Sequence, residues 1–125
     1  MWPAYTRHMR PLSDRERDLI IALIARGTEP GADRAIAASD RERWAGQLPG
    51  VMVHGTCGCG TCPSIDLIRD SGGRPAPTRQ TVLEASTSNA FLLLFIEDDR
   101  PTYLELAPFG DEPITEFPLV ADVEF

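Results

Sequence analysis

The chain has 125 residues, of which 42% are hydrophobic and 25% are charged, and this size and composition suit one folded domain rather than two domains or a disordered chain. Its 19 acidic and 12 basic side chains give a formal net charge of −7. Such a surface repels phosphate backbones and anionic lipids, so we expect no binding to nucleic acid or membranes, and a basic protein fits the charge better as a partner.

We expect residues 1–125 to form a single domain with loose termini at 1–11 and 118–125. The segment Met1–Leu12 has no apolar run and is not expected to be a signal peptide. The longest apolar stretch, Ala90–Ile96, is too short to cross a bilayer. The sequence therefore predicts a cytoplasmic protein, whose three cysteines are reduced thiols rather than a disulfide scaffold.

The first predicted element is a helix over about Asp14–Arg26. Its start has the spacing of a capping box, in which Ser13 accepts from a backbone amide and Glu16 reaches back. Gly27 is a natural stop. The apolar residues inside it form one stripe at helical spacing: Leu19, Ile20, Leu23 and Ile24.

A second helical region is expected between the turn at 28–31 and Pro49-Gly50. Asp33 can cap it, and Ser39–Glu42 has the spacing of a second capping box. The region is therefore either one helix or two short ones with a bend. We expect it to pack through alanines, Ile36 and Trp44.

After Gly50 the pattern changes to strands. The expected strands are Val51–His54, Ser64–Arg69, Thr81–Ala85, Ala90–Ile96 and Thr102–Leu106. Because Ala90–Ile96 is apolar on both faces, we expect a central strand that is covered on both sides. The predicted fold class is α+β, with two N-terminal helices packed on one face of an antiparallel β-meander of about five strands.

The tail from Ala107 contains three prolines, which exclude regular structure across most of it. It is also acidic, and it mixes this charge with apolar groups. Such a segment suits a docking surface for a basic partner. It equally suits a tail that folds onto its own sheet, which we favour for Phe109 and Phe117.

The most distinctive feature is a cluster of four possible metal ligands: His54, Cys57, Cys59 and Cys62. Zinc takes four nitrogen or sulfur donors, and the Cys59–Cys62 spacing is usual for a zinc knuckle. Against this, the Cys57–Cys59 spacing is tighter than the common pairing, and all four residues come from one short segment. We expect no cofactor, with zinc at this cluster as the one alternative.

Two other interpretations use the same segment. A thiol oxidoreductase acting through Cys59-x-x-Cys62 would need a helix that starts near Ser64 and lowers the pKa of a thiol at its N-terminus. The simpler interpretation is a hairpin, in which glycines supply the turn, Pro63 stops further pairing, and the cysteines pack as small apolar groups. We favour the hairpin.

Catalytic groups are scarce in this chain. His54 with Cys57 or Cys59 is the only local nucleophile–base pair, and the sequence offers no third group to orient it. Acidic residues 97–99 stand at a predicted hairpin turn, where solvation explains them. We therefore predict no catalytic residue and favour a function other than catalysis.

The run from Cys57 to Leu67, with the Leu12–Glu16 segment, the apolar residues 91–96 and the segment 109–113, resembles small uncharacterised proteins of actinobacteria. Those proteins carry a Cys-x-Cys-Gly-Cys-Pro-Ser/Thr-Ile/Val-Asp-Leu stretch followed by a strand pair and a Tyr-Gly-Asp-x-Pro segment. This chain differs by an additional Thr61 within the run and by Phe109 in place of the tyrosine. The resemblance implies organisation but no activity.

The size, acidity and expected architecture are similar to those of small immunity proteins that neutralise toxins. We therefore expect a non-enzymatic protein-interaction module, of the inhibitor or immunity type. A zinc-stabilised domain and a thiol oxidoreductase are the two alternatives.

Overall fold

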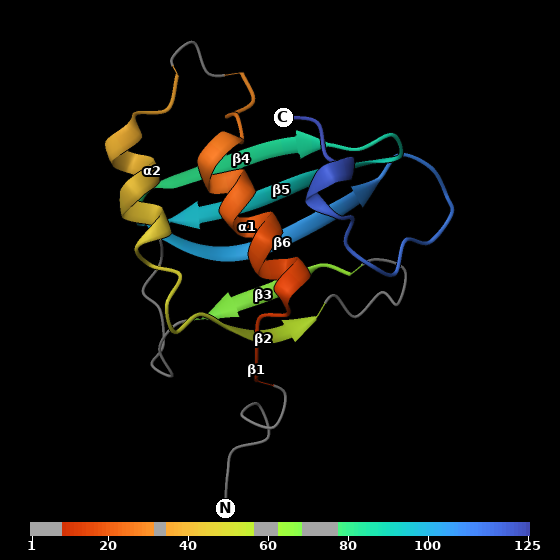
Figure 1. Ribbon diagram of the computed structural model, residues 1–125, viewed down its shortest axis with the longest axis horizontal. Coiled ribbons are helices and arrows are strands. Elements are labelled where there is room, and N and C mark those ends of the chain that lie inside the picture. The colour runs from red at the N-terminus through yellow and green to blue at the C-terminus, as the bar shows by residue number, and fades with distance from the viewer. Residues whose placement is uncertain (1–8, 32–34, 57–62, 69–77) are drawn as a thin grey trace, which may run out of the picture.

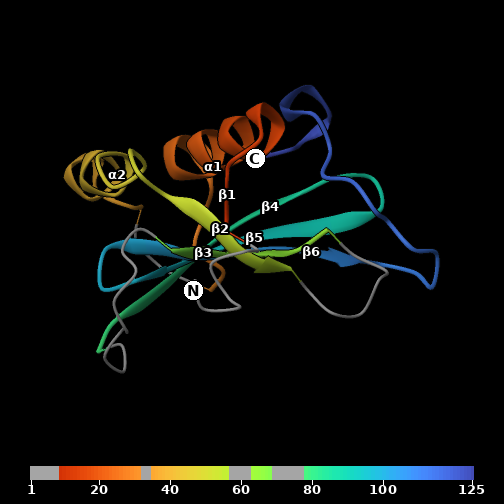
Figure 2. The ribbon, with the colours of Figure 1, turned by 90° about the horizontal axis from the view of Figure 1, so that it is seen from below.

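The computed structural model describes residues 9–31, 35–56, 63–68 and 78–125. These residues form an α+β fold, in which two helices and the C-terminal segment lie on one side of an antiparallel sheet (Figures 1 and 2). The elements are β1 (Arg10–Pro11), α1 (Asp14–Arg26), α2 (Ala38–Ala45), β2 (Met52–Thr56), β3 (Ile65–Ile68), β4 (Gln80–Ser86), β5 (Ala90–Glu97), β6 (Arg100–Pro108) and the 3₁₀ turn η2 (Val120–Asp122). In this described part of the chain, no helix is long and apolar enough to cross a bilayer.

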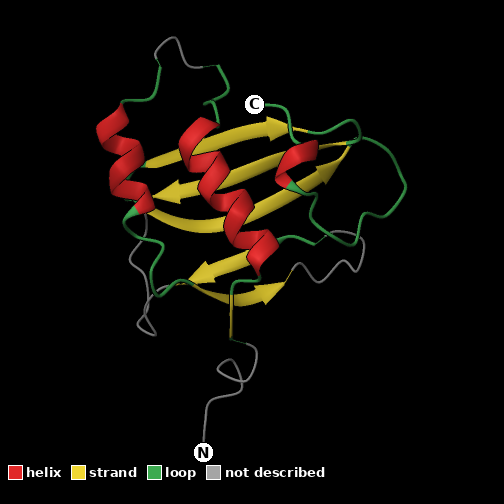
Figure 3. Cartoon of the chain, in the orientation of Figure 1, coloured by secondary structure: helices red, strands yellow, loops and turns green. Residues whose placement is uncertain are grey.

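The expected five-stranded meander is wrong. The described residues form six strands in the order β1-β2-β3-β6-β5-β4. The strands are labelled in Figure 1 and drawn in yellow in Figure 3. The additional strand, β1, has only two residues, of which one is a proline, so it leaves no pattern in the sequence. In addition, β3 pairs with β6 rather than with its chain neighbour β4, which becomes an edge strand. The meander rule assumes that neighbours in the chain also pair, and it holds here within β1–β2–β3 and within β4–β5–β6 but fails between β3 and β4.

Helix α1 has the predicted bounds, and its capping box is formed. The amide of Glu16 donates to Ser13 Oγ at 3.1 Å, and the amide of Ser13 donates to Glu16 Oε1 at 2.8 Å. At the other end Gly27 passes close to the helix, since a Cβ at this position would lie 2.6 Å from the carbonyl oxygen of Leu23. Glycine is therefore required here for space.

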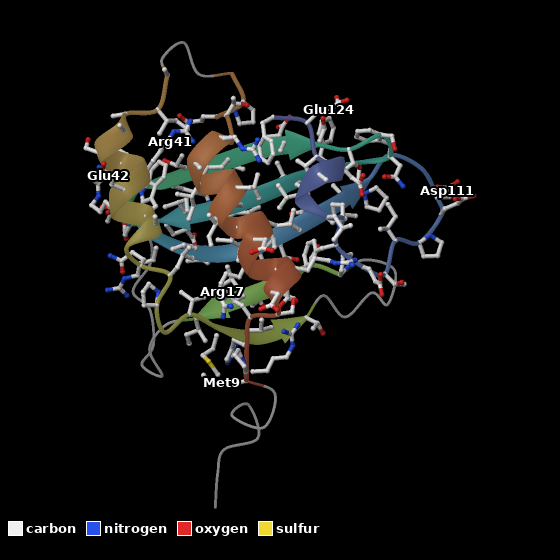
Figure 4. All side chains as sticks on the ribbon, in the orientation of Figure 1. Met9, Arg17, Arg41, Glu42, Asp111 and Glu124 are labelled. Atoms are coloured by element: carbon white, nitrogen blue, oxygen red, sulfur yellow. The ribbon has the colours of Figure 1, made fainter. Side chains whose placement is uncertain are left out.

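Helix α2 is shorter than the predicted region and has no capping box, because its N-cap is Ala37. Tertiary contacts hold it instead. The Trp44 side chain is 2% exposed in the core. Arg41 donates to the carbonyl oxygens of Ile24 at 2.8 Å and Gly27 at 2.9 Å, so α2 supplies the hydrogen bonds that the end of α1 lacks (Figure 4).

The hydrophobic core fills the layer between the helices and the sheet. The tail contributes to it, since Phe117 is 4% exposed and Val120 and Val123 pack against the cluster. The amide of Glu124 donates to the Ser86 carbonyl at 2.7 Å, and the Ser86 amide donates back at 3.0 Å. The sequence left open whether the tail is docked or free, and the structure docks it through Phe117. Phe109 contacts Phe91 on the other face of the sheet but is 54% exposed.

Strand β5 is not covered on both sides by the described elements. Leu92, Leu94 and Ile96 face the helices and are buried, whereas the alternate residues of β5 are half-buried or exposed. An apolar strand is expected to be covered on both faces when helices flank the sheet on both sides. Here both helices lie on one side (Figure 2).

Candidate functional site

The sheet face opposite the helices carries a strip of apolar side chains along β5. Strand register places Val82 and Tyr103 beside Phe95, and Ser86 and Ala107 beside Phe91. Cross-strand partners project from the same face of a sheet, so these side chains are neighbours. We use the name outer face for this set: Asp66, Val82, Glu84, Phe91, Leu93, Phe95, Tyr103, Glu105 and Phe109.

Aromatic contacts hold the outer face together. The rings of Phe91 and Phe109 meet edge to face, with centroids 4.8 Å apart, and those of Phe95 and Tyr103 with centroids 5.8 Å apart. Both pairs have the geometry that aromatic rings prefer. Phe91 is nevertheless 42% exposed and Phe109 is 54% exposed. Exposed aromatic residues on one face are a feature of surfaces that bind another molecule.

Carboxylates flank this apolar strip. Glu84 and Glu105 are the two cross-strand partners of Leu93, one on each side, and Asp66 is the partner of Tyr103. Within the residues that the structure describes, none of these three carboxylates is in an ion pair. The outer face therefore combines an apolar centre with uncompensated negative charge.

No protein-family model, curated protein or solved structure matches this chain. The resemblance of the cysteine run to small actinobacterial proteins thus stays an expectation from the sequence.

The predicted metal cluster falls mostly outside the described residues. Cys57, Cys59 and Cys62 lie in the segment 57–62, and only His54 can be placed. It is half-buried in β2, where the register shifts between Val53 and the residue after His54. In the four described ranges, no three His, Cys, Asp or Glu residues are close enough to hold a metal ion. The cluster itself stays a prediction.

The residues on either side of the cysteine run form an antiparallel strand pair. Thr56 at the end of β2 is the register partner of Ile65 at the start of β3. Just before β3, the buried Ser64 accepts a hydrogen bond at 3.0 Å from the amide of Leu106 in β6. The redox interpretation needs a helix after Cys62, and the described chain has a strand there, as the hairpin interpretation requires.

The sequence suggested only solvation for the carboxylates at the β5–β6 turn, and the structure gives them specific partners. Asp98 and Asp99 both have positive φ, 49° and 68°, as a two-residue hairpin turn requires. Asp98 accepts from the Thr78 hydroxyl at 2.9 Å and from the Arg79 amide at 3.0 Å. Hydrogen bonds from Thr78 and the Arg79 amide lower the pKa of Asp98.

Asp99 joins the same turn to α2. Its Oδ1 accepts from the indole Nε1 of Trp44 at 3.0 Å, and its Oδ2 lies 3.1 Å from Nε of Arg43. The hydrogen bond from Arg43, followed by that from Trp44, lowers the pKa of Asp99. These carboxylates therefore have a structural role. The signal that the sequence offered was a pair of aspartates between two strands, since Asp tolerates positive φ.

A cleft lies on the helix-bearing side, between the first turn of α1 and the tail. Its volume is about 670 Å³. Its lining residues are Arg10, Ser13, Arg15, Glu16, Thr56, Pro63, Ile65, Thr115, Glu116 and Phe117. The sequence did not indicate this cleft, because its walls come from four segments that only folding brings together.

Proposed function

We propose that this protein is a non-enzymatic interaction module whose outer face binds a basic protein segment, as an inhibitor or immunity protein would. The observation that carries the proposal is the position of Leu93 in β5, between Glu84 and Glu105 and in line with Phe91 and Phe95. Exposed aromatic side chains supply the area for binding, and the carboxylates, which have no ion-pair partner among the described residues, select the charge of the partner.

The partner that fits this face presents lysine or arginine side chains beside apolar ones. The apolar groups would cover Leu93 and Phe95, and the cations would meet Glu84 and Glu105. A cation over an exposed aromatic ring adds about 0.5–1 kcal/mol. The net charge of −7 also speeds the approach of a basic partner at low salt.

Backbone pairing along the edge of β4 that faces away from β5 favours binding through the outer face over addition of a strand. Thr28 and Glu84 exchange backbone hydrogen bonds at 3.1 and 2.7 Å, and Ser86 and Glu124 exchange another pair. Backbone groups that are already paired cannot accept a further strand. At Glu84 and Ser86 a partner therefore meets the side chains of the outer face rather than free backbone groups of β4.

The test uses two synthetic peptides, an amphipathic Lys/Leu helix and its Glu/Leu counterpart, with binding followed by amide NMR shifts of the whole chain. We expect the Lys/Leu peptide alone to bind, to shift outer-face residues, and to bind more weakly at high salt. The double variant Glu84→Lys with Glu105→Lys should weaken binding at least about tenfold.

The matched control is Asp111→Lys with Glu112→Lys, which makes the same change in net charge in an exposed loop (Figure 4). This control should reduce affinity much less. Equal loss in both variants would mean that total charge, and not the outer face, attracts the peptide, and would refute the proposal.

A zinc-stabilised domain is a second candidate, supported by the strand pair that brackets the cysteine run. Thr56 and Ile65, which flank the cysteine run in the sequence, are cross-strand partners, whereas the cysteines themselves lie outside the described residues. Elemental analysis of untagged protein, with thiol titration before and after chelation, tests it. We expect one zinc per chain and thiols that react faster after chelation; three reactive thiols without metal would exclude it.

A further inference from the structure

The cleft beside α1 is built around two arginines that differ in how their hydrogen-bonding capacity is used. Arg10 meets Glu16 in a two-pronged pair, with both nitrogen–oxygen distances at 2.8 Å. It also donates to the carbonyl of Pro11 at 3.1 Å. Glu16 is further occupied by the Ser13 amide. This part of the cleft is therefore neutral and satisfied.

Arg15 is only partly used. Its Nη1 donates to the carbonyl oxygen of Phe117 at 3.0 Å and reaches Glu116 Oε2 at 3.4 Å. Among the described residues, Nη2 and Nε of Arg15 have no partner, and the side chain is 41% exposed. A guanidinium offers five N–H donors in a planar fork that matches a carboxylate. Arg15 therefore has donors available for a second carboxylate.

The chain's own Glu116 already occupies this position weakly. Its side chain is 81% exposed, and its single contact to Arg15 is long for a charge-assisted hydrogen bond. Exposed ion pairs of this kind contribute between about 0 and 1 kcal/mol. Glu116 thus shows that a carboxylate reaches Arg15, and a ligand can displace it at little cost.

The rest of the cleft suits an organic body rather than a bare ion. The half-buried Pro63 supplies apolar surface, the buried Ile65 and Phe117 form the floor beneath it, and Thr56 and Thr115 add hydroxyl groups. The volume of about 670 Å³ lies within the range of roughly 300–1,000 Å³ that is usual for small-molecule sites.

We propose that this cleft binds a small organic carboxylate with an apolar body, whose carboxylate replaces that of Glu116 on Arg15. The apolar body lies in the cleft against the half-buried Pro63. The cleft lies between α1 and the tail, both of which are on the helix-bearing side of the sheet (Figure 2), so it is separate from the outer face and does not depend on the proposed function.

The test is an amide NMR titration of the whole chain with 2-naphthylacetate, and with its neutral amide as the matched ligand. We expect naphthylacetate to shift residues of the cleft, and naphthylacetamide to bind at least about tenfold more weakly, because it lacks the charge that Arg15 recognises. Equal binding of the two compounds would overturn the proposal.

Three variants locate the binding. Arg15→Gln should weaken naphthylacetate binding about tenfold. Arg17 is similarly exposed, 49% against 41%, and is paired with Asp14 outside the cleft, so Arg17→Gln should leave binding unchanged (Figure 4). Glu116→Gln removes the competing carboxylate and should strengthen binding by up to about fivefold. This variant keeps the test decisive even where Arg15→Gln loosens the tail. Unchanged or weaker binding in Glu116→Gln would refute the displacement of Glu116.

Discussion

The indole of Trp44 donates a hydrogen bond at 3.0 Å to Asp99, a residue at the tip of the β5–β6 turn. This contact fixes a short helix that has no side-chain cap to one end of the sheet. Asp99 serves two purposes at once, because its positive φ forms the turn while its carboxylate receives Trp44 and Arg43. The position of α2 therefore depends on a residue more than fifty positions further along the chain.

Replacing Asp99 with alanine should destabilise the fold by about 1–3 kcal/mol, because the buried Trp44 donor would be left without a partner. Asn keeps both an acceptor and the tolerance for positive φ, so Asp99→Asn should lose clearly less. Urea unfolding followed by tryptophan fluorescence measures both. If the two variants were equally stable, the hydrogen bond to Trp44 would not be what holds α2.

Glu16 should make the stability of the fold depend on pH. Burial raises its pKa, but hydrogen bonds from Arg10 and Ser13 and the charge of Arg10 outweigh this and lower it below the ordinary value of 4.5. The folded protein therefore binds this proton less tightly than the unfolded chain. The stabilisation is complete above pH 4.5, and it is lost as the pH falls through the lower pKa of the folded state.

The variant Glu16→Gln isolates this effect. It should cost about 1–2 kcal/mol of unfolding free energy at neutral pH, and the difference from the original chain should shrink as the solution is acidified toward pH 3. Urea unfolding at a series of pH values measures it, with the exposed-tail variant Glu112→Gln as the control. A cost that stays constant across the series would show that the charge of Glu16 is not involved.

Local signals predicted α1 well, because its cap, its stripe and its stop all lie within fifteen residues of sequence around Asp14–Arg26. Contacts between distant segments were the ones missed. The pairing of β3 with β6 depends on Leu104 and Ser64, which the sequence does not link. The same is true of α2, whose partners lie in the β5–β6 turn and at the end of α1.

The candidate interaction surface was missed for a related reason. An apolar run such as Ala90–Ile96 is compatible with coverage on both faces, and the pattern alone does not distinguish a covered face from one that is kept for a partner. The observation that distinguishes the two cases is that both described helices pack on the same side of the sheet and leave the other side without a helix layer. The glutamates beside Leu93 become informative once the register is known.

Ser64 should be required for the stability of the β3–β6 junction. Its hydroxyl is buried and accepts from the Leu106 amide, so Ser64→Ala would leave that amide unpaired and cost about 1–3 kcal/mol. Ser88→Ala is the matched control, since Ser88 is exposed in the β4–β5 turn. Thermal or urea unfolding compares the two. If Ser64→Ala were as stable as Ser88→Ala, the hydrogen bond between Ser64 and Leu106 would contribute nothing to the free energy of unfolding.

The C-terminal residues should protect the edge of β4. The backbone of Glu124 pairs with that of Ser86. At the next residue, the guanidinium of Arg26 lies over the ring of Phe125, with Arg26 Cζ 4.2 Å from the ring centroid. A chain that ends at Val123 leaves the amide and carbonyl of Ser86 unpaired on an edge strand. Unpaired edges of this kind recruit strands of other chains.

We therefore expect the chain shortened by Glu124 and Phe125 to self-associate at concentrations where the full chain does not, as measured by sedimentation velocity over a concentration series. The control is Phe125→Ala, which removes the contact with Arg26 but keeps the backbone pairing of Glu124. It should sediment like the full chain. If Phe125→Ala associated as strongly as the shortened chain, the aromatic contact rather than the paired backbone would be what protects β4.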